Sequence, residues 1–112
     1  MYSIALCEFE YILISAAAAL GNDAYGVAIR EEIAATTRRR CSIGALYTTM
    51  ERLERKGLLK TWAGESTPER GGRAKRMVRV TAEGVGAAKE FYERVVRISR
   101  NVSWAEGLES NT

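Results

Sequence analysis

The apolar and polar positions in the first third of the chain form a pattern typical of two helices. Residues 6–20 are rich in alanine and other apolar residues without a helix breaker, which predicts a mostly buried helix that ends at Gly21. Asn22 and Asp23 can then cap a second helix over residues 24–36. Its apolar positions are Val27, Ile29 and Ile33. Its water-facing positions are Arg30, Glu31 and Glu32.

A third helix is predicted over residues 42–56. The Ser42 hydroxyl can cap its start, and Gly57 can adopt the left-handed conformation that follows a helix end. One face carries apolar residues at spacings of three and four, namely Ile43, Leu46, Met50 and Leu53. The opposite face is small, polar or basic, with Tyr47 on its flank, and consists of Gly44, Thr48, Arg52 and Arg55.

After the third helix the pattern changes from helical to strand-like. Residues 58–62 and 77–81 are short runs of β-branched, aromatic and aliphatic residues separated by a polar stretch, which predicts a β-hairpin. Its tip, residues 65–74, contains Pro68, Gly71 and Gly72, so we expect a long and mobile tip.

A last helix is predicted over residues 82–102, with Thr81 as its cap and with glycines at 84 and 86 that loosen its first turn. Its apolar residues alternate steps of three and four, as in the seam of a coiled coil, and are Ala88, Phe91, Val95, Ile98 and Val102, widened by Tyr92 and Val96. A small domain has little surface with which to cover this stripe, so we expect a homodimer. The alternative is that the helix packs back on its own domain.

Composition limits the possible functions. The 112 residues leave room for one domain, and 46% apolar with 28% charged residues is typical of a globular protein. No stretch reaches the roughly 20 apolar residues of a membrane span, so we expect a cytoplasmic protein with no membrane partner. With two cysteines and no histidine, we expect no disulfide, metal, cofactor or enzymatic activity. Cys41 is expected to be an ordinary thiol, with oxidant sensing as the alternative.

Charge is segregated along the chain. Residues 37–80 hold twelve Lys/Arg and four Asp/Glu, a net charge of +8, whereas the remaining residues carry −5. A basic middle between acidic flanks is typical of a surface that binds a polyanion. The alternative is a solvated basic face.

The order of helix, helix, helix and hairpin is that of a winged helix-turn-helix, in which the third helix enters the major groove of DNA. The basic residues gather just before the third helix, on its outer face, and in and beside the wing, namely Arg38, Arg39, Arg40, Arg52, Arg55, Arg70, Arg73, Lys75 and Arg76. The predicted fold is therefore mostly α with a small β-hairpin wing. We expect a DNA-binding domain over residues 1–81, a dimerisation helix over 82–102 and a flexible tail over 103–112.

Four further segments occur in a fixed order. They are Tyr25-Gly26, Gly44-Ala45-Leu46-Tyr47, Leu53-Glu54-Arg55-Lys56-Gly57-Leu58, and Gly71-Gly72 followed by Arg79-Val80-Thr81-Ala82-Glu83-Gly84. This ordered series resembles the successive signatures of the PadR family. The resemblance covers residues 8–100. It implies a transcriptional repressor of the compact branch, dimeric through its C-terminal helix and acting on a palindromic operator.

The chain departs from the family pattern at three places. Thr48 stands where the family often has proline, and Met77 and Val78 stand where it often has two aromatic residues. Some compact members resemble receptors for flat aromatic compounds and use a tryptophan on the last helix, where this chain has Val95. The resemblance therefore does not carry that ligand over, and a small-molecule effector remains open.

Individual roles follow from these patterns. Thr48 and Arg52 are candidates for base-edge contacts, whereas Arg38, Arg39, Arg40, Arg73 and Lys75 suit phosphates. The resemblance implies that Tyr47 reaches the DNA backbone, and a half-buried core tyrosine is the alternative. The candidate DNA-binding residues are Arg38, Arg39, Arg40, Ser42, Gly44, Tyr47, Thr48, Arg52, Arg70, Arg73 and Lys75, and the candidate dimer residues are Ala88, Phe91, Tyr92, Val95, Ile98 and Val102.

Three other functions remain open. The same fold can bind protein through its third helix, or the chain can modulate a larger regulator through the heptad seam. RNA binding is a weaker alternative because the sequence offers no aromatic platform for unstacked bases. Steep, salt-dependent binding of duplex DNA by the pure protein would distinguish a DNA-binding regulator from these alternatives.

Overall fold

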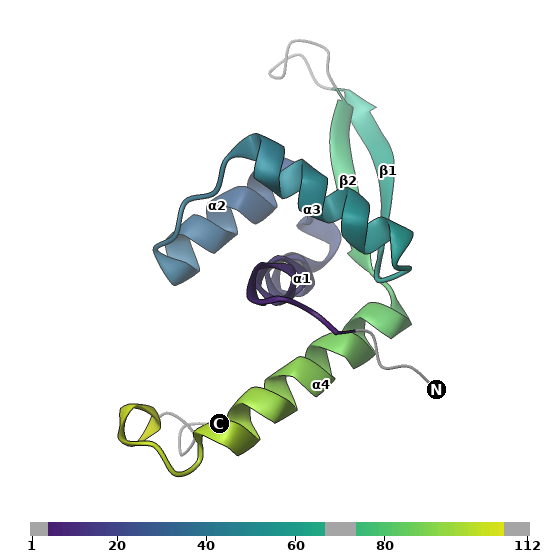
Figure 1. Ribbon diagram of the computed structural model, residues 1–112. Helices are drawn as coiled ribbons and strands as arrows, with labels where there is room; N and C mark the ends of the chain where they lie inside the picture. The colour runs from purple at the N-terminus through teal and green to yellow at the C-terminus, as the bar shows by residue number, and fades with distance from the viewer. Residues whose placement is uncertain (1–4, 67–73, 107–112) are drawn as a thin grey trace.

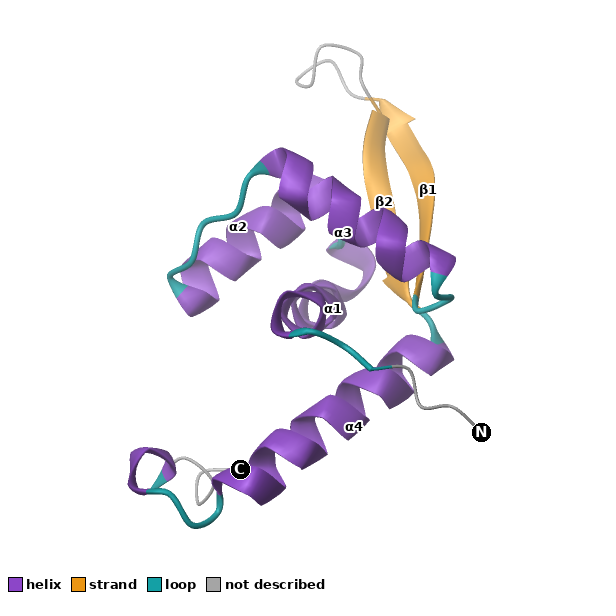
Figure 2. Ribbon diagram, viewed as in Figure 1, coloured by secondary structure: helices purple, strands orange, loops and turns teal. Residues whose placement is uncertain are grey.

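The computed structural model describes residues 5–66 and 74–106 and shows a helical domain with one two-stranded sheet (Figures 1 and 2). The main helices and strands follow the predicted order and are α1 (Glu8–Leu20), α2 (Gly26–Thr37), α3 (Ile43–Arg55), β1 (Leu59–Ser66), β2 (Ala74–Val80) and α4 (Ala82–Ser99). Two short 3₁₀ turns, η1 (Gly21–Asp23) and η3 (Ser103–Ala105), follow α1 and α4. None of the helices in the described parts of the chain is long and apolar enough to cross a membrane.

The core forms around α1, which lies between α3 on one side and α4 on the other (Figure 1). Large apolar side chains from every main element except α4 meet there with at most 2% of their surface exposed, among them Leu13, Ile29, Ile33, Leu46, Leu53, Leu58 and Val78. The predicted stripe of α3 supplies Leu46, Met50 and Leu53 to this core, whereas Ile43, at the start of the helix, remains 44% exposed. One continuous core therefore fixes the orientation of α3.

The turn between α1 and α2 differs from the prediction. Asn22 and Asp23 lie in η1 and do not cap α2, whose preceding residue is Tyr25. Tyr25 forms an isolated bridge with Met77, and the Val78 amide donates to the Ala24 carbonyl at 3.0 Å. The chain before α2 is therefore held extended against β2, which delays the start of the helix.

The hairpin is antiparallel and longer than predicted. Leu59 pairs with Val80 and Trp62 with Met77, and the register shifts between Ala63 and Ser66. Backbone pairing extends β1 beyond residue 62 because ladder hydrogen bonds form regardless of the low strand propensity of the residues that carry them. Most of the predicted tip, residues 67–73, lies outside the described residues.

A dense junction joins α4 to the hairpin. The Thr81 hydroxyl accepts from the Gly84 amide at 3.0 Å, as predicted for a cap, and donates to the Gly57 carbonyl at 2.7 Å. Gly84 is buried, and a methyl group there would collide with the carbonyl oxygen of Leu58. Gly84 therefore permits close packing, and it does not merely loosen the first turn. The helix ends at Ser99, three residues earlier than expected.

Candidate nucleic-acid interface

The outer face of α3 is exposed and free of bulky apolar groups. Four exposed residues lie on it within an arc of about 60° at the helical repeat, namely Gly44, Thr48, Glu51 and Arg55. Gly44 has no neighbouring atom within 4 Å of where a side chain would begin. The predicted Arg52 lies on one edge of this face rather than in its middle, beyond Thr48. The acidic Glu51, which sequence reasoning did not single out, lies at the other edge, beside Tyr47.

Both ends of α3 are fixed as predicted. The Ser42 hydroxyl accepts from the Ala45 amide at 3.0 Å, so its side chain caps the helix. Gly57 has φ 79°, and the Leu58 amide donates to the Leu53 carbonyl at 2.9 Å. The Ser42 hydroxyl therefore serves the helix itself, and the backbone conformation at Gly57 favours glycine.

Tyr47 is half-buried on the flank of α3, and its phenol ring lies against Gly26 in the first turn of α2. A methyl group at Gly26 would overlap the Tyr47 ring and hydroxyl. Gly26 and Tyr47, which are distant in the sequence, thus form one contact. This contact ties α3 to α2 and brings the Tyr47 hydroxyl to the start of α2.

A buried carboxylate connects α1 to α3. Glu10 is 2% exposed, and its Oε2 accepts from Arg52 Nε at 2.9 Å and from Lys56 Nζ at 2.8 Å. Its Oε1 accepts from the Cys7 amide at 2.9 Å. Burial opposes ionisation, but the hydrogen bonds from Lys56, the Cys7 amide and Arg52 outweigh it and lower the pKa of Glu10 from 4.5 to about 2. Glu10 in turn raises the pKa of Arg52.

The three consecutive arginines before α3 differ in their surroundings. Arg38 ends α2 in the left-handed conformation at φ 60° and is exposed, as is Arg40. Arg39 pairs with Glu8 at 2.8 Å and lies 5.6 Å from the centre of the Phe9 ring. In the described part of the chain neither Arg38 nor Arg40 forms an ion pair, so these two charges remain available to a ligand.

The described part of the wing carries three basic side chains near aromatic or acidic groups. Lys75 Nζ lies 4.5 Å from the centre of the Tyr25 ring, and Arg79 lies 5.8 Å from that of Trp62. Arg76 approaches Glu54 at 4.0 Å, and Glu54 also accepts from the Thr61 hydroxyl at 3.0 Å, which ties the wing to α3. The candidates Arg70 and Arg73, and the glycines Gly71 and Gly72, lie outside the described residues.

The predicted seam of α4 divides into two groups. Ala88 packs against the core, and Phe91 stacks on Tyr11 of α1 with ring centres 4.5 Å apart. Tyr92, Val95 and Ile98 are 46%, 44% and 80% exposed, respectively. Val102 is half-buried and lies beyond the end of α4, directly before η3. The first half of the seam thus packs within the chain, as in the alternative reading, while the second half is exposed.

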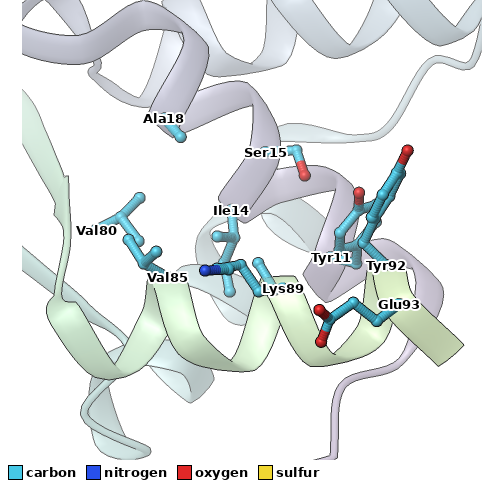
Figure 3. Close-up of a pocket in the computed structure, with 10 residues that line it drawn as sticks. Tyr11, Ile14, Ser15, Ala18, Val80, Val85, Lys89, Tyr92 and Glu93 are labelled. Atoms are coloured by element: carbon cyan, nitrogen blue, oxygen red, sulfur yellow. The ribbon is translucent and has the colours of Figure 1, made fainter. Parts of the chain in front are cut away.

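An open apolar groove of about 450 Å³ runs between α1 and α4 beside this exposed surface (Figure 3). Val80 and Val85 lie toward one end, Ile14 lies near the middle, and Tyr11 and Tyr92 lie toward the other end (Figure 3). Lys89 and Glu93 are charged residues on its α4 side. Sequence reasoning missed the contribution of α1, although Tyr11, Ser15 and Ala18 follow a helical spacing that could have indicated a second face.

The described residues offer little for metal or covalent chemistry. No group of three His, Cys, Asp or Glu side chains could hold a metal ion among them, and Cys7 and Cys41 are free thiols.

The buried Glu10 is a further functional residue that sequence reasoning missed. It falls three residues before Leu13 and seven before Ala17, which are buried on the same helix, and this spacing is a signal for a buried carboxylate.

Comparison with solved structures shows the same fold in known regulators. A transcriptional regulator from Clostridium thermocellum is 28% identical, with a TM-score of 0.63 over 84% of this chain and 92% of its own. A PadR family transcriptional regulator from Eggerthella lenta is 23% identical, with a TM-score of 0.64 over 83% and 80% of the two chains. MepR of S. aureus, solved as a DNA complex, is 15% identical, with a TM-score of 0.52 over 95% and 71%.

Among curated proteins no match is found. The model of the transcriptional regulator PadR-like family matches residues 16–90, which includes α2, α3, the hairpin and the first half of α4. This match spans more than half of the chain, and the protein therefore belongs to the transcriptional regulator PadR-like family.

Proposed function

We propose that this protein is a repressor that binds a palindromic operator in double-stranded DNA as a homodimer. The observation that carries the proposal is the outer face of α3, which is exposed and lacks large apolar groups. Exposed arginines at 38, 39 and 40 directly precede this helix, and basic residues of the wing follow it in the chain. The structural resemblance to MepR, which was solved bound to DNA, supports a fold suited to this task. A DNA-binding regulator of this kind acts in the cytoplasm.

The face of α3 suits the major groove. Gly44 and Thr48 add little bulk, so the backbone of the helix can come close to the base edges. The Thr48 hydroxyl or methyl group then contacts a base. Arg52 contributes from the edge of the face. Its Nε is held by Glu10, and its terminal nitrogens would donate to a base or a phosphate.

Phosphate contacts come from the surrounding cations. Arg38, Arg40 and Lys75 supply charge near the face of α3, and the Tyr47 hydroxyl at the start of α2 adds a hydrogen bond to the backbone. Arg39 also contacts a phosphate. To do so it must leave its ion pair with Glu8, which is exposed, and such pairs contribute only about 0–1 kcal/mol to stability. Arg70 and Arg73 of the wing remain proposed phosphate contacts on sequence grounds.

The second copy of the chain is proposed to cover the exposed half of α4. Tyr92, Val95 and Ile98 form an apolar surface that continues into the groove beside α1. Symmetric association of two copies buries this apolar surface and the groove. It also places the two α3 helices in a twofold arrangement that matches a palindrome.

The direct test of function is fluorescence anisotropy with a duplex from the upstream region of the protein's own gene and with a shuffled duplex of the same composition. We expect tighter binding to the upstream duplex. A reporter placed behind that region should then be expressed less when the protein is present. Absence of binding to both duplexes at low salt would reject the proposal and favour a protein-interaction module.

A further inference from the structure

Glu51 is an exposed acidic residue on a face of α3 that otherwise suits a polyanion. It lies on the same line of α3 as Gly44, Thr48 and Arg55, opposite the buried Leu46 and Leu53. Its position is fixed because the helix is capped at Ser42 and tied to α1 through Glu10. Any ligand that contacts this face therefore meets a carboxylate.

The carboxylate of Glu51 has no partner of its own among the described residues. No hydrogen bond or ion pair joins it to a side chain within residues 5–66 or 74–106, and it lines a shallow hollow with Tyr47, Glu54, Thr61 and Arg76. The basic group of that hollow, Arg76, is paired with Glu54 instead. Glu51 therefore plays no part in the contacts that hold α3 in place, in contrast to Glu54, which anchors the wing.

An unpaired carboxylate on a DNA-binding face is unfavourable unless it receives a hydrogen bond there. Phosphates repel it, and so do the acceptor atoms that guanine and thymine present in the major groove. Cytosine presents an N4 amino group, which donates to Glu or Asp, whereas adenine presents a donor beside an acceptor. The groove position opposite Glu51 thus accepts one base well and disfavours the other three.

We infer that Glu51 is a specificity-determining residue that accepts a hydrogen bond from the N4 amino group of a cytosine in each half-site. The inference rests on the proposed insertion of α3 into the major groove. Through its charge Glu51 also weakens binding to DNA that lacks the cytosine. The residue therefore sharpens the choice of operator at the expense of nonspecific affinity.

The test compares wild type with Glu51→Gln, Glu51→Ala and the control Glu83→Gln. Glu83 is exposed at the start of α4, so its replacement changes net charge as Glu51→Gln does without altering α3. Each protein is used to select duplexes from a randomised pool, and the selected duplex is then titrated with each of the four bases at the position of interest. Circular dichroism checks that the helical content is unchanged.

The wild type and Glu83→Gln are expected to prefer cytosine at one position of each half-site by about 5- to 150-fold. Glu51→Ala should lose this preference and bind shuffled duplex more tightly. Glu51→Gln should shift the preference toward adenine, because an amide can pair with both N6 and N7 of that base. If the wild type selects an operator but Glu51→Gln keeps every base preference, the inference is wrong and the proposed function stands. If the wild type binds no duplex, both are wrong.

Discussion

The Nε atom of Arg52 donates a hydrogen bond to Glu10 Oε2 across 2.9 Å, although the two residues lie 42 positions apart. Lys56 Nζ contacts the same oxygen at 2.8 Å. A single buried carboxylate on α1 thus receives two cations from the C-terminal part of α3. This arrangement fixes the position of α3 and limits which atoms of Arg52 can reach a ligand.

Glu10→Gln should destabilise the protein by about 2–3 kcal/mol at neutral pH, because it removes the charge that pairs with Arg52 and Lys56. The pKa of Glu10 is lowered in the folded state from 4.5 to about 2. Its stabilisation is therefore fully present above pH 4.5 and is lost as the pH falls toward 2. Urea unfolding at several pH values should show the difference between wild type and variant shrinking below pH 4.5.

Glu8→Gln is the matched control for Glu10, since its pair with Arg39 is exposed on both sides. Its replacement should cost about 0–1 kcal/mol. An equal loss of stability in the two variants, or a Glu10→Gln effect that does not change with pH, would contradict the role assigned to the buried carboxylate.

Gly26→Ala should destabilise the fold by about 1–3 kcal/mol, because the new methyl group overlaps the ring of Tyr47. In a Tyr47→Ala background the same substitution should be neutral or stabilising, since alanine is the better helix former. Thermal unfolding of the four proteins in this cycle measures the coupling between the two positions. Equal effects of Gly26→Ala in both backgrounds would show that Tyr47 is not the constraint.

The two glycines in the first turns of α4 should respond in opposite directions. At Gly84 a methyl group would collide with the backbone carbonyl of Leu58, so Gly84→Ala should cost about 1–3 kcal/mol. At Gly86 no atom lies within 4 Å of the added methyl, so Gly86→Ala should stabilise the protein by up to about 1 kcal/mol. Denaturant titration distinguishes the two, and the same sign at both positions would argue against the close contact at Leu58.

Replacing Val95 and Ile98 with Asp should convert a dimer into a monomer without loss of helical content, because both side chains are exposed within the chain. Phe91 is unsuitable for this test, since it stacks on Tyr11 and its loss would disturb the fold. Light scattering gives the mass, and Arg97→Asp on the opposite face of α4 is the control. A double variant that keeps the mass of the wild type would remove this half of α4 from the interface.

Much of the fold follows from spacing in the sequence. The stripe of Leu46, Met50 and Leu53, the cap at Ser42 and the left-handed Gly57 are local features, and the structure confirms them. The winged-helix fold class and the family assignment are likewise confirmed. Membership in a family of transcriptional regulators also agrees with the expectation of a function other than enzymatic catalysis.

The features that sequence reasoning missed depend on contacts between distant residues. The helix α2 begins later than predicted because Tyr25, directly before it, pairs with Met77 of the hairpin. No local cap signal in the sequence reveals this pairing. Glu10 binds Arg52 and Lys56, and its importance appears only when α1 and α3 are packed together. The direct roles of Thr48, Arg52 and the arginines before α3 in binding DNA remain predictions.

Contact between DNA and the loop before α3 is measured best by the salt dependence of operator binding by wild type, Arg40→Ala and the control Arg97→Ala. For the wild type, the logarithm of the affinity should fall steeply with the logarithm of the salt concentration, by about 0.9 for each phosphate contacted. Arg40→Ala should lower this slope by about two, one contact per protomer of a dimer, and Arg97→Ala should not change it. A wild-type slope near zero, or equal slopes for Arg40→Ala and wild type, would contradict the placement of DNA at α3 and its preceding loop.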